Sequence, residues 1–166
     1  MPLPPSPIGF DATVLINFCE VGRLDLLVAV VPPPRYVLVD VLEELENPAC
    51  RELVQTGISR AEIVLTEIQN DLELRLWARY TLRLDAGESA TLAAAVSRGW
   101  SLASDDRAAR RVAESELGPG RLTGTVGILR AAVEAGLLTL GAGNQRLAQM
   151  VAAGYRSPVR SLDQAE

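Results

Sequence analysis

The sequence predicts an α/β fold, in which a parallel sheet of four to five strands is covered by helices on both faces. Three observations predict it. The chain has 166 residues, the usual size of one domain, and 48% of them are apolar, which is enough for a single core. Short runs of β-forming residues alternate with helical patterns, as in βαβ units. Acidic and hydroxyl residues follow several expected strands, where ligands bind in such folds.

Five short runs fit the strands. Ile8–Phe10 is apolar and precedes an aspartate, and Arg35–Val39 is rich in β-forming residues and follows a run of prolines. Three further short runs of β-forming residues come later in the chain. The strands are therefore expected at residues 8–10, 35–39, 61–67, 100–104 and 121–125.

Apolar residues recur at helical spacing between these runs. The longest pattern covers residues 68–84, where Leu72, Leu76 and Tyr80 would form one stripe. We interpret this stripe as core packing, although a surface for a partner is the alternative. Helices are expected at residues 13–22, 23–31, 41–48, 68–84, 86–99, 105–115, 126–136 and 144–153.

The residue types exclude several chemistries. Lysine and histidine are absent, arginine supplies all 16 positive charges, and Cys19 and Cys50 are the only cysteines. Two thiols are too few for a disulfide framework or a zinc site, and we expect them to be buried and free. A metal ion would be bound by oxygen atoms, which favours Mg²⁺ or Mn²⁺. The net charge of −5 provides no large basic surface for duplex nucleic acid.

The sequence shows no sign of a targeting or membrane segment. Residues 1–10 lack the basic and apolar regions of a signal peptide, and the longest apolar run, Leu26–Val31, is too short to span a bilayer. We expect a cytoplasmic protein with a single domain over residues 1–166 and a core at about residues 8–155.

Carboxylates follow the first two expected strands. Asp11 either caps the next helix or binds a metal ion. Asp40 begins a helix that ends at Pro48, and with Glu43 it forms a capping-box pattern. Glu44 is then either solvated or turned into a cleft. Because the carboxyl ends of parallel strands share one edge of the sheet, these acids are expected on the same side.

Two further acidic pairs come later. Asp85 and Glu88 repeat the capping pattern, but Glu88 lies on a helix with little other charge and needs a partner if it is buried. Asp105 and Asp106 are adjacent, so only one of them can cap the following helix, and its arginines could neutralise them. Four or five acids at one edge raise one another's pKa unless a divalent cation lies between them. Such an ion can activate water against a phosphodiester, so the pattern indicates a nuclease.

Four segments together resemble the PIN domain family, and more narrowly its VapC-type branch of toxin-like ribonucleases. They are FDATVLINFCEVGRLDLL, VLVDVLEEL, LDAGESATLAAAVSRGWSLASDDRAARRVA and TGTVGILRAAVEAGLL. Each motif is weak alone, but their order and spacing are fairly specific and cover residues 8–155. The resemblance implies a three-layer α/β/α sandwich around a parallel sheet, and RNA cleavage that depends on Mg²⁺ or Mn²⁺.

The resemblance also implies roles for individual residues. The matched catalytic acids are Asp11, Glu44, Glu88 and Asp106, and the matched metal ligands are these four together with Asp105. The supporting positions are Thr13, Ser104 and Thr125. The arginines placed to contact RNA are Arg107, Arg110 and Arg111. The hydroxyl of Thr125, at a helix N-terminus, would help to hold a phosphate or a water.

The resemblance implies partners as well. VapC-type relatives are usually dimeric toxins of type II toxin–antitoxin pairs, each inhibited by a small antitoxin that blocks the acidic cleft. RNA as substrate, a small antitoxin protein and a homodimer are therefore expected. The alternative is a PIN-like module that binds RNA or protein without cutting. Dehalogenase-type phosphatases and response-regulator receivers need a lysine, which is absent, and there is no P-loop.

Overall fold

The sheet has five parallel strands in the order β3-β2-β1-β4-β5. A computed structural model describes residues 2–164. The strands are β1 (Ile8–Phe10), β2 (Arg35–Leu38), β3 (Val64–Thr66), β4 (Ser101–Ala103) and β5 (Leu122–Thr123). From β1, the chain first adds β2 and β3 on one side of the sheet. It then returns to add β4 and β5 on the other side of β1, so the strand order reverses between β1 and β4. Such a switch point is where parallel sheets bind ligands.

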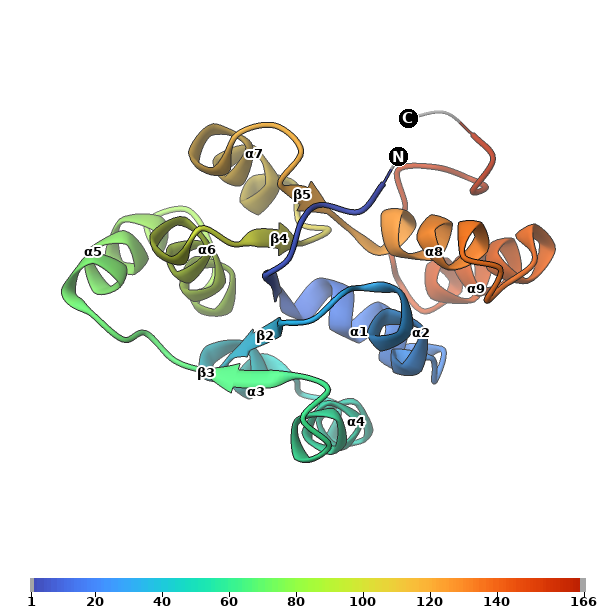
Figure 1. Cartoon of the computed structure of the whole chain (residues 1–166), viewed down its shortest axis with the longest axis horizontal. Coiled ribbons are helices and arrows are strands. Elements are labelled where there is room, and N and C mark those ends of the chain that lie inside the picture. The colour runs from blue at the N-terminus through green and yellow to red at the C-terminus, as the bar shows by residue number, and fades with distance from the viewer. Residues whose placement is uncertain (1, 165–166) are drawn as a thin grey trace.

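Helices lie on both sides of this sheet (Figure 1). One group, at the left of Figure 1, is α5, α6 and α7, and the other group, at the right, is α1, α2, α8 and α9, while α3 and α4 lie near β2 and β3. The helices are α1 (Ala12–Glu20), α2 (Leu24–Val30), α3 (Val39–Glu44), α4 (Pro48–Ser59), α5 (Asp71–Tyr80), α6 (Ala86–Arg98), α7 (Arg107–Leu117), α8 (Thr125–Glu134) and α9 (Leu140–Ala152). The predicted α/β/α sandwich with a parallel sheet is confirmed.

Helix α6 packs closely on the centre of the sheet. It contacts β1, β2 and β4, and both β1 and β4 are buried along their whole length, as expected for parallel strands covered on two faces. Gly9 of β1 permits the close approach, because a Cβ at that position would lie 3.0 Å from Cγ2 of Thr91 on α6. The first turn of α6 is thereby held near the end of β1.

The prediction that a helix ends at Pro48 is wrong. Helix α3 ends at Glu44, and Pro48 instead begins α4, for which no helix is predicted. Proline is well suited to the first position of a helix, because its missing N–H would have no partner there. The side chain of Asn47 caps this helix by accepting from Ala49 N at 3.0 Å. A proline can therefore start a helix as well as stop one.

The helix predicted over residues 68–84 is too long, and its predicted core stripe is only partly right: Tyr80 is buried and Leu76 packs against the core, but Leu72 does not. Helix α5 covers only Asp71–Tyr80, and Leu72 in the predicted core stripe is 56% exposed. Glu73 is completely buried instead. Its carboxylate accepts hydrogen bonds from Arg98, which lies 25 residues further along the chain. The ion pair of Glu73 and Arg98 therefore fastens α5 to α6 in addition to the apolar contacts of Leu76 and Tyr80.

The predicted capping role of Asp40 is wrong too. Helix α3 begins at Val39 with Leu38 at its N-cap, so Asp40 lies inside the first turn and caps nothing. Both cysteines are free, as predicted; Cys50 is buried, whereas Cys19 is only half-buried. Over residues 2–164, no helix combines the length and the apolar character needed to cross a membrane.

Candidate active site

The carboxyl ends of four strands meet at one edge of the sheet. Asp11 directly follows β1, Glu44 ends the helix after β2, and Asp106 follows β4. The backbone ladder continues beyond the strands, because Asp11 N donates to Ala103 O at 3.0 Å and Ser104 N donates to Thr123 O at 3.1 Å. The predicted acids are therefore carried by backbone that is fixed in register.

Asp11 is the most buried of these acids. Only 1% of its surface is exposed, and its Oδ2 accepts hydrogen bonds from Ser104 Oγ at 2.8 Å and from Thr13 Oγ1 at 2.9 Å. Its side chain does not cap α1, although Asp11 occupies the N-cap position, so the capping interpretation is wrong. Within residues 2–164, Oδ1 is the one buried side-chain oxygen or nitrogen without a hydrogen-bond partner. A buried oxygen without a partner destabilises the folded protein unless a bound water or ion pairs with it.

Two of the acids have strongly raised pKa values. Burial raises the pKa of Asp11 to about 6, against the opposing effect of the Ser104 and Thr13 hydrogen bonds, and Glu44 adds to the rise. Burial, followed by the negative charges of Asp11 and Asp106, raises the pKa of Glu88 to about 7. Acids from distant parts of the chain therefore lie close enough for their charges to affect Asp11 and Glu88.

The carboxylate of Glu44 is held against the start of α6. Its Oε1 accepts from Gly87 N at 2.6 Å, one of the otherwise unpaired amides of the first helical turn. A Cβ at Gly87 would overlap the Glu44 carboxylate. Of the two interpretations left open by the sequence, a solvated side chain or one turned inward, the structure supports the second.

Glu88 closes the predicted capping box, and its catalytic role stays a prediction. Its Oε2 accepts from Asp85 N at 3.3 Å, which is the return bond of the predicted capping box. The side chain is half-buried, and the charges of Asp11 and Asp106 act on it. Capping thus fixes Glu88 at the edge of the acid cluster.

The two adjacent aspartates, Asp105 and Asp106, make different contacts. Asp106 caps α7, with its Oδ1 accepting from Ala109 N at 2.8 Å. Ser104 Oγ accepts from Asp106 N at 3.2 Å and donates to Asp11, so that it links the two acids. Within residues 2–164, neither aspartate forms an ion pair with an arginine of α7. The predicted neutralisation by these arginines is therefore wrong.

Asp105 faces a different set of groups and is saturated by them. Its Oδ1 accepts from Thr125 N at 3.0 Å and from the Tyr155 hydroxyl at 3.1 Å. Its Oδ2 accepts from Thr125 Oγ1 at 2.5 Å and from Asn17 Nδ2 at 3.0 Å. Asp105 therefore ties α1, α8 and the segment after α9 to the end of β4. The hydroxyl of Thr125 is engaged in the same way, so it is not directed at an external phosphate.

Two residues of this network, Asn17 and Tyr155, are missing from the sequence-based prediction. Asn17 is buried in the otherwise apolar helix α1, and its Nδ2 also donates to Thr125 Oγ1 at 3.0 Å. A lone amide among apolar residues is a signal that could have been used. Tyr155 follows the last helix and carries no such signal.

The donor atoms fit a hard divalent cation. All the acids offer oxygen, and Asp11 Oδ1 is buried without a partner. As the side chains stand, no three Asp, Glu or Cys residues within 2–164 are grouped closely enough to hold one ion. Mg²⁺ takes few protein ligands and keeps several waters. The cluster therefore suits an ion that is bound directly by one or two carboxylates and through water by the others.

A parallel α/β sandwich with acids gathered at its switch point defines the class of the protein. The chain matches the PIN domain family (DUF3368) over residues 8–165 and belongs to it. PIN domains are a family of nucleases that typically use divalent metals. No curated protein matches the chain. The predicted resemblance to PIN domains is thus confirmed, while the narrower VapC-type likeness stays a prediction.

The contact between Glu44 and Gly87 leads to a prediction. Gly87→Ala should displace the Glu44 carboxylate and lower any nuclease activity by about a hundredfold, the usual cost of an ångström-scale displacement. The free energy of unfolding should change by no more than about 1 kcal/mol, because the helix preference of alanine offsets the lost hydrogen bond from residue 87 to Glu44. Cleavage assays and urea unfolding test this. Gly141→Ala on α9 is the control, because a Cβ there meets nothing within 4 Å. Equal activity in the two variants would contradict the prediction.

Proposed function

We propose that this protein is a Mg²⁺- or Mn²⁺-dependent endoribonuclease. The observation that carries the proposal is the buried carboxylate of Asp11, which has one unpartnered oxygen and lies within electrostatic reach of Glu44 and Glu88. Hydrogen bonds hold each of the four carboxylates, but the charge of Glu44 raises the pKa of Asp11, and the charges of Asp11 and Asp106 raise that of Glu88. A divalent cation between them would relieve this repulsion. Carboxylates with strongly raised pKa values that lie close together are typical of functional sites.

Each acid has a distinct part in the proposed site. One or two of Asp11, Glu44 and Asp106 would bind the metal ion directly, and the remainder would bind it through water. Asp105 orients the surrounding elements instead, because its oxygens already accept four hydrogen bonds. Thr13 and Ser104 keep the Asp11 carboxylate in one orientation. When bound, the ion supplies an activated water and stabilises charge on the phosphodiester oxygens.

Glu88 is suited to move a proton. Its pKa of about 7 lets it exchange a proton at neutral pH, and its Oε2 is anchored on the backbone of Asp85. We assign Glu88 the role of proton acceptor, and Oε1 would take the proton because Oε2 is already bonded to Asp85 N. The raised pKa values of Asp11 and Glu88 also imply that metal binding weakens below about pH 6 to 7, because protons compete with the cation.

The biological role that fits best is the toxin of a type II toxin–antitoxin pair. This part of the proposal is supported by the VapC-type sequence likeness. It implies a homodimer and a small antitoxin protein that covers the acid cluster. Growth arrest on expression, relieved by co-expression of a small protein encoded in the adjacent reading frame, is the expected result. No effect on growth in the presence of cleavage in vitro would separate the toxin role from the enzyme activity.

The enzyme proposal is tested with neighbouring glutamates. Glu44→Gln should reduce the cleavage of single-stranded RNA in Mn²⁺ by about 10- to 100-fold, as loss of a metal ligand or its support usually does. Glu43→Gln, which makes the same change one residue earlier on the exposed side of α3, should leave it unaltered. Cleavage is followed by gel electrophoresis over a range of Mn²⁺ concentrations. RNA binding without cleavage at any concentration would favour the non-catalytic PIN-like module instead.

A further inference from the structure

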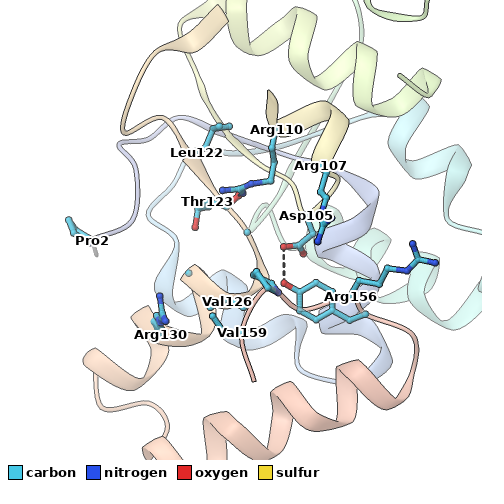
Figure 2. A pocket seen from close by; sticks show the side chains of 14 residues that line it. Pro2, Asp105, Arg107, Arg110, Leu122, Thr123, Val126, Arg130, Arg156 and Val159 are labelled. Carbon is cyan, nitrogen blue, oxygen red and sulfur yellow. Dashed lines mark hydrogen bonds between the residues drawn. The ribbon is translucent and has the colours of Figure 1, made fainter. Parts of the chain in front are cut away.

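A pocket of about 410 Å³ lies beside the acid cluster, at the end of β5 and the start of α8. Figure 2 shows it bounded by α7, which carries Arg107 and Arg110, and by α8, which carries Arg130. Arg156, after α9, completes the set of four arginines, against a single lining carboxylate, Asp105. We name this cavity the arginine pocket. It concentrates positive charge in a chain whose net charge is −5.

The arginine pocket is adjacent to the proposed site of cleavage. A second hollow, of about 320 Å³, is lined by Thr13 and Asp106 of that site. Asp105, Tyr155 and Arg156 line both cavities. The hydrogen bond between Asp105 and Tyr155 in Figure 2 therefore belongs to a thin wall between them. A ligand that extends from Asp106 into the arginine pocket passes over this wall, next to Arg156.

Two of the four arginines are held by backbone carbonyls and two are not. Arg130 donates from Nε to Leu162 O at 2.9 Å and from Nη2 to Gln164 O. Arg110 is fixed, because its Nη1 donates to Ser104 O and Thr123 O, both at 2.8 Å. Carbonyls are neutral, so its charge is held in place without an ion pair. Arg107 and Arg156 are exposed, and within residues 2–164 they have no hydrogen bond or ion pair. They are thus available to an anionic group near the wall.

Part of the remaining lining is apolar, although Thr123 and Tyr155 add two polar side chains. Leu122 and Val159 are half-buried there, whereas Val126 is nearly fully buried. The volume falls within the range of small-ligand sites, about 300–1,000 Å³. An apolar wall with guanidinium groups at its rim suits a planar base joined to a phosphate. An acidic peptide would use the arginines but would leave the apolar surface uncovered.

We propose that the arginine pocket binds the RNA nucleotide next to the one that is cut. Its base lies against Leu122 and Val159, and its phosphate binds Arg107 and Arg156. This inference rests on the proposed function, since it places the pocket on the path of the same RNA strand. It adds Arg156 to the RNA-binding residues and replaces Arg111, which does not line the pocket.

The test measures RNA affinity without cleavage. A short fluorescein-labelled single-stranded RNA is titrated with the full chain in EDTA, and binding is followed by fluorescence polarisation. The double variant Arg107→Ala/Arg156→Ala should raise Kd at least about tenfold and lower the slope of log affinity against log salt by about 0.7 for each lost phosphate contact. Arg75→Ala removes an exposed arginine from α5 and should change Kd less than about twofold. Equal effects of the double variant and Arg75→Ala would overturn the proposal.

A variant without a charge change tests the apolar part. Val159→Trp fills the pocket and should weaken RNA binding about tenfold while the salt slope stays the same. Thermal melting checks that each variant is folded. Polyglutamate is added as a competitor of the labelled RNA, and we expect it to displace none of the RNA. If the pocket variants instead lose polyglutamate binding and keep RNA binding, the pocket belongs to an acidic protein segment and the proposal fails.

The two proposals fail separately. RNA binding that depends on Arg107 and Arg156 in a protein that never cleaves RNA would leave the pocket assigned and remove the nuclease. Cleavage with an unchanged KM in the double variant would retain the nuclease and remove the pocket from its substrate path.

Discussion

Asp11→Asn is expected to reduce RNA cleavage by about a hundred- to a thousandfold, the scale for losing one well-placed electrostatic group. Asn offers one acceptor oxygen and no charge in place of the unpartnered Oδ1, so the proposed metal ion would lose its most buried ligand. Mn²⁺ should raise the melting temperature of the original chain and leave that of the variant unchanged. Unaltered cleavage would remove Asp11 from the mechanism.

The same substitution should stabilise the metal-free protein at neutral pH. The pKa of Asp11 is raised from 3.8 to about 6 in the folded state, so the folded chain binds this proton more tightly than the unfolded chain. The stability linked to it is fully present below about pH 4 and is lost as the pH rises through about 6. For a shift of this size the loss approaches about 3 kcal/mol. Asparagine does not titrate, and the loss should disappear.

Urea unfolding in EDTA at about pH 5 and about pH 7.5 measures this effect. The original chain should be less stable at the higher pH, and Asp11→Asn should show a smaller difference. Asp40→Asn is the matched control, because Asp40 lies on α3 without a capping role. If Asp11→Asn is no more stable than the original chain at the higher pH, burial of the charged Asp11 carboxylate does not destabilise the fold.

The alternation of strands and helices was predictable because its signals are local. Each strand is a short run of apolar or β-forming residues beside a turn, and the strands lie within a few residues of their expected positions. Pro48 was misread because a proline marks both a helix end and a first helical position, and only the geometry of Asn47 decides between them. A residue such as proline, which can mark either the start or the end of a helix, does not by itself fix a helix boundary.

The acids of the site were predictable as residue types, whereas their partners were not. Asp11, Glu88 and Asp106 follow strand ends or open helices, which the sequence shows directly. The saturation of Asp105 depends on Asn17 and Tyr155, which are 88 and 50 residues away. Contacts at such separations leave no periodic pattern. Arg156 joins the arginine pocket for the same reason, through the path of the chain after α9.

The buried pair of Glu73 and Arg98 should dominate the stability of the α5 side of the molecule. Glu73 is fully buried and accepts from Arg98 Nε and Nη2, both at 2.7 Å, and from Gln69 N at 2.8 Å. Arg98 also donates to Thr66 Oγ1 at 3.0 Å, and its guanidinium lies 4.8 Å from the ring of Trp100. The pair thus joins α5, α6, β3 and β4.

Arg98→Met is expected to destabilise the protein by about 3–5 kcal/mol, because it leaves the Glu73 carboxylate buried without its partner. The pKa of Glu73 is now held below its usual value by Arg98, so this group stabilises the fold above about pH 4.5 and the contribution fades as the pH falls. In the variant the pKa of Glu73 should rise above its usual value, because the carboxylate is buried without Arg98. Lowering the pH should then protonate Glu73 and restore part of the lost stability.

Urea unfolding at several pH values distinguishes this account from a simple loss of packing. Glu73→Leu/Arg98→Met should recover much of the stability, because removing both charges leaves none buried alone. Arg79→Met is the comparison, since Arg79 pairs with Glu116 at 2.6 Å on the surface and its loss should matter far less. If Arg98→Met were no more harmful than Arg79→Met, the buried pair would not be what fastens α5 to α6.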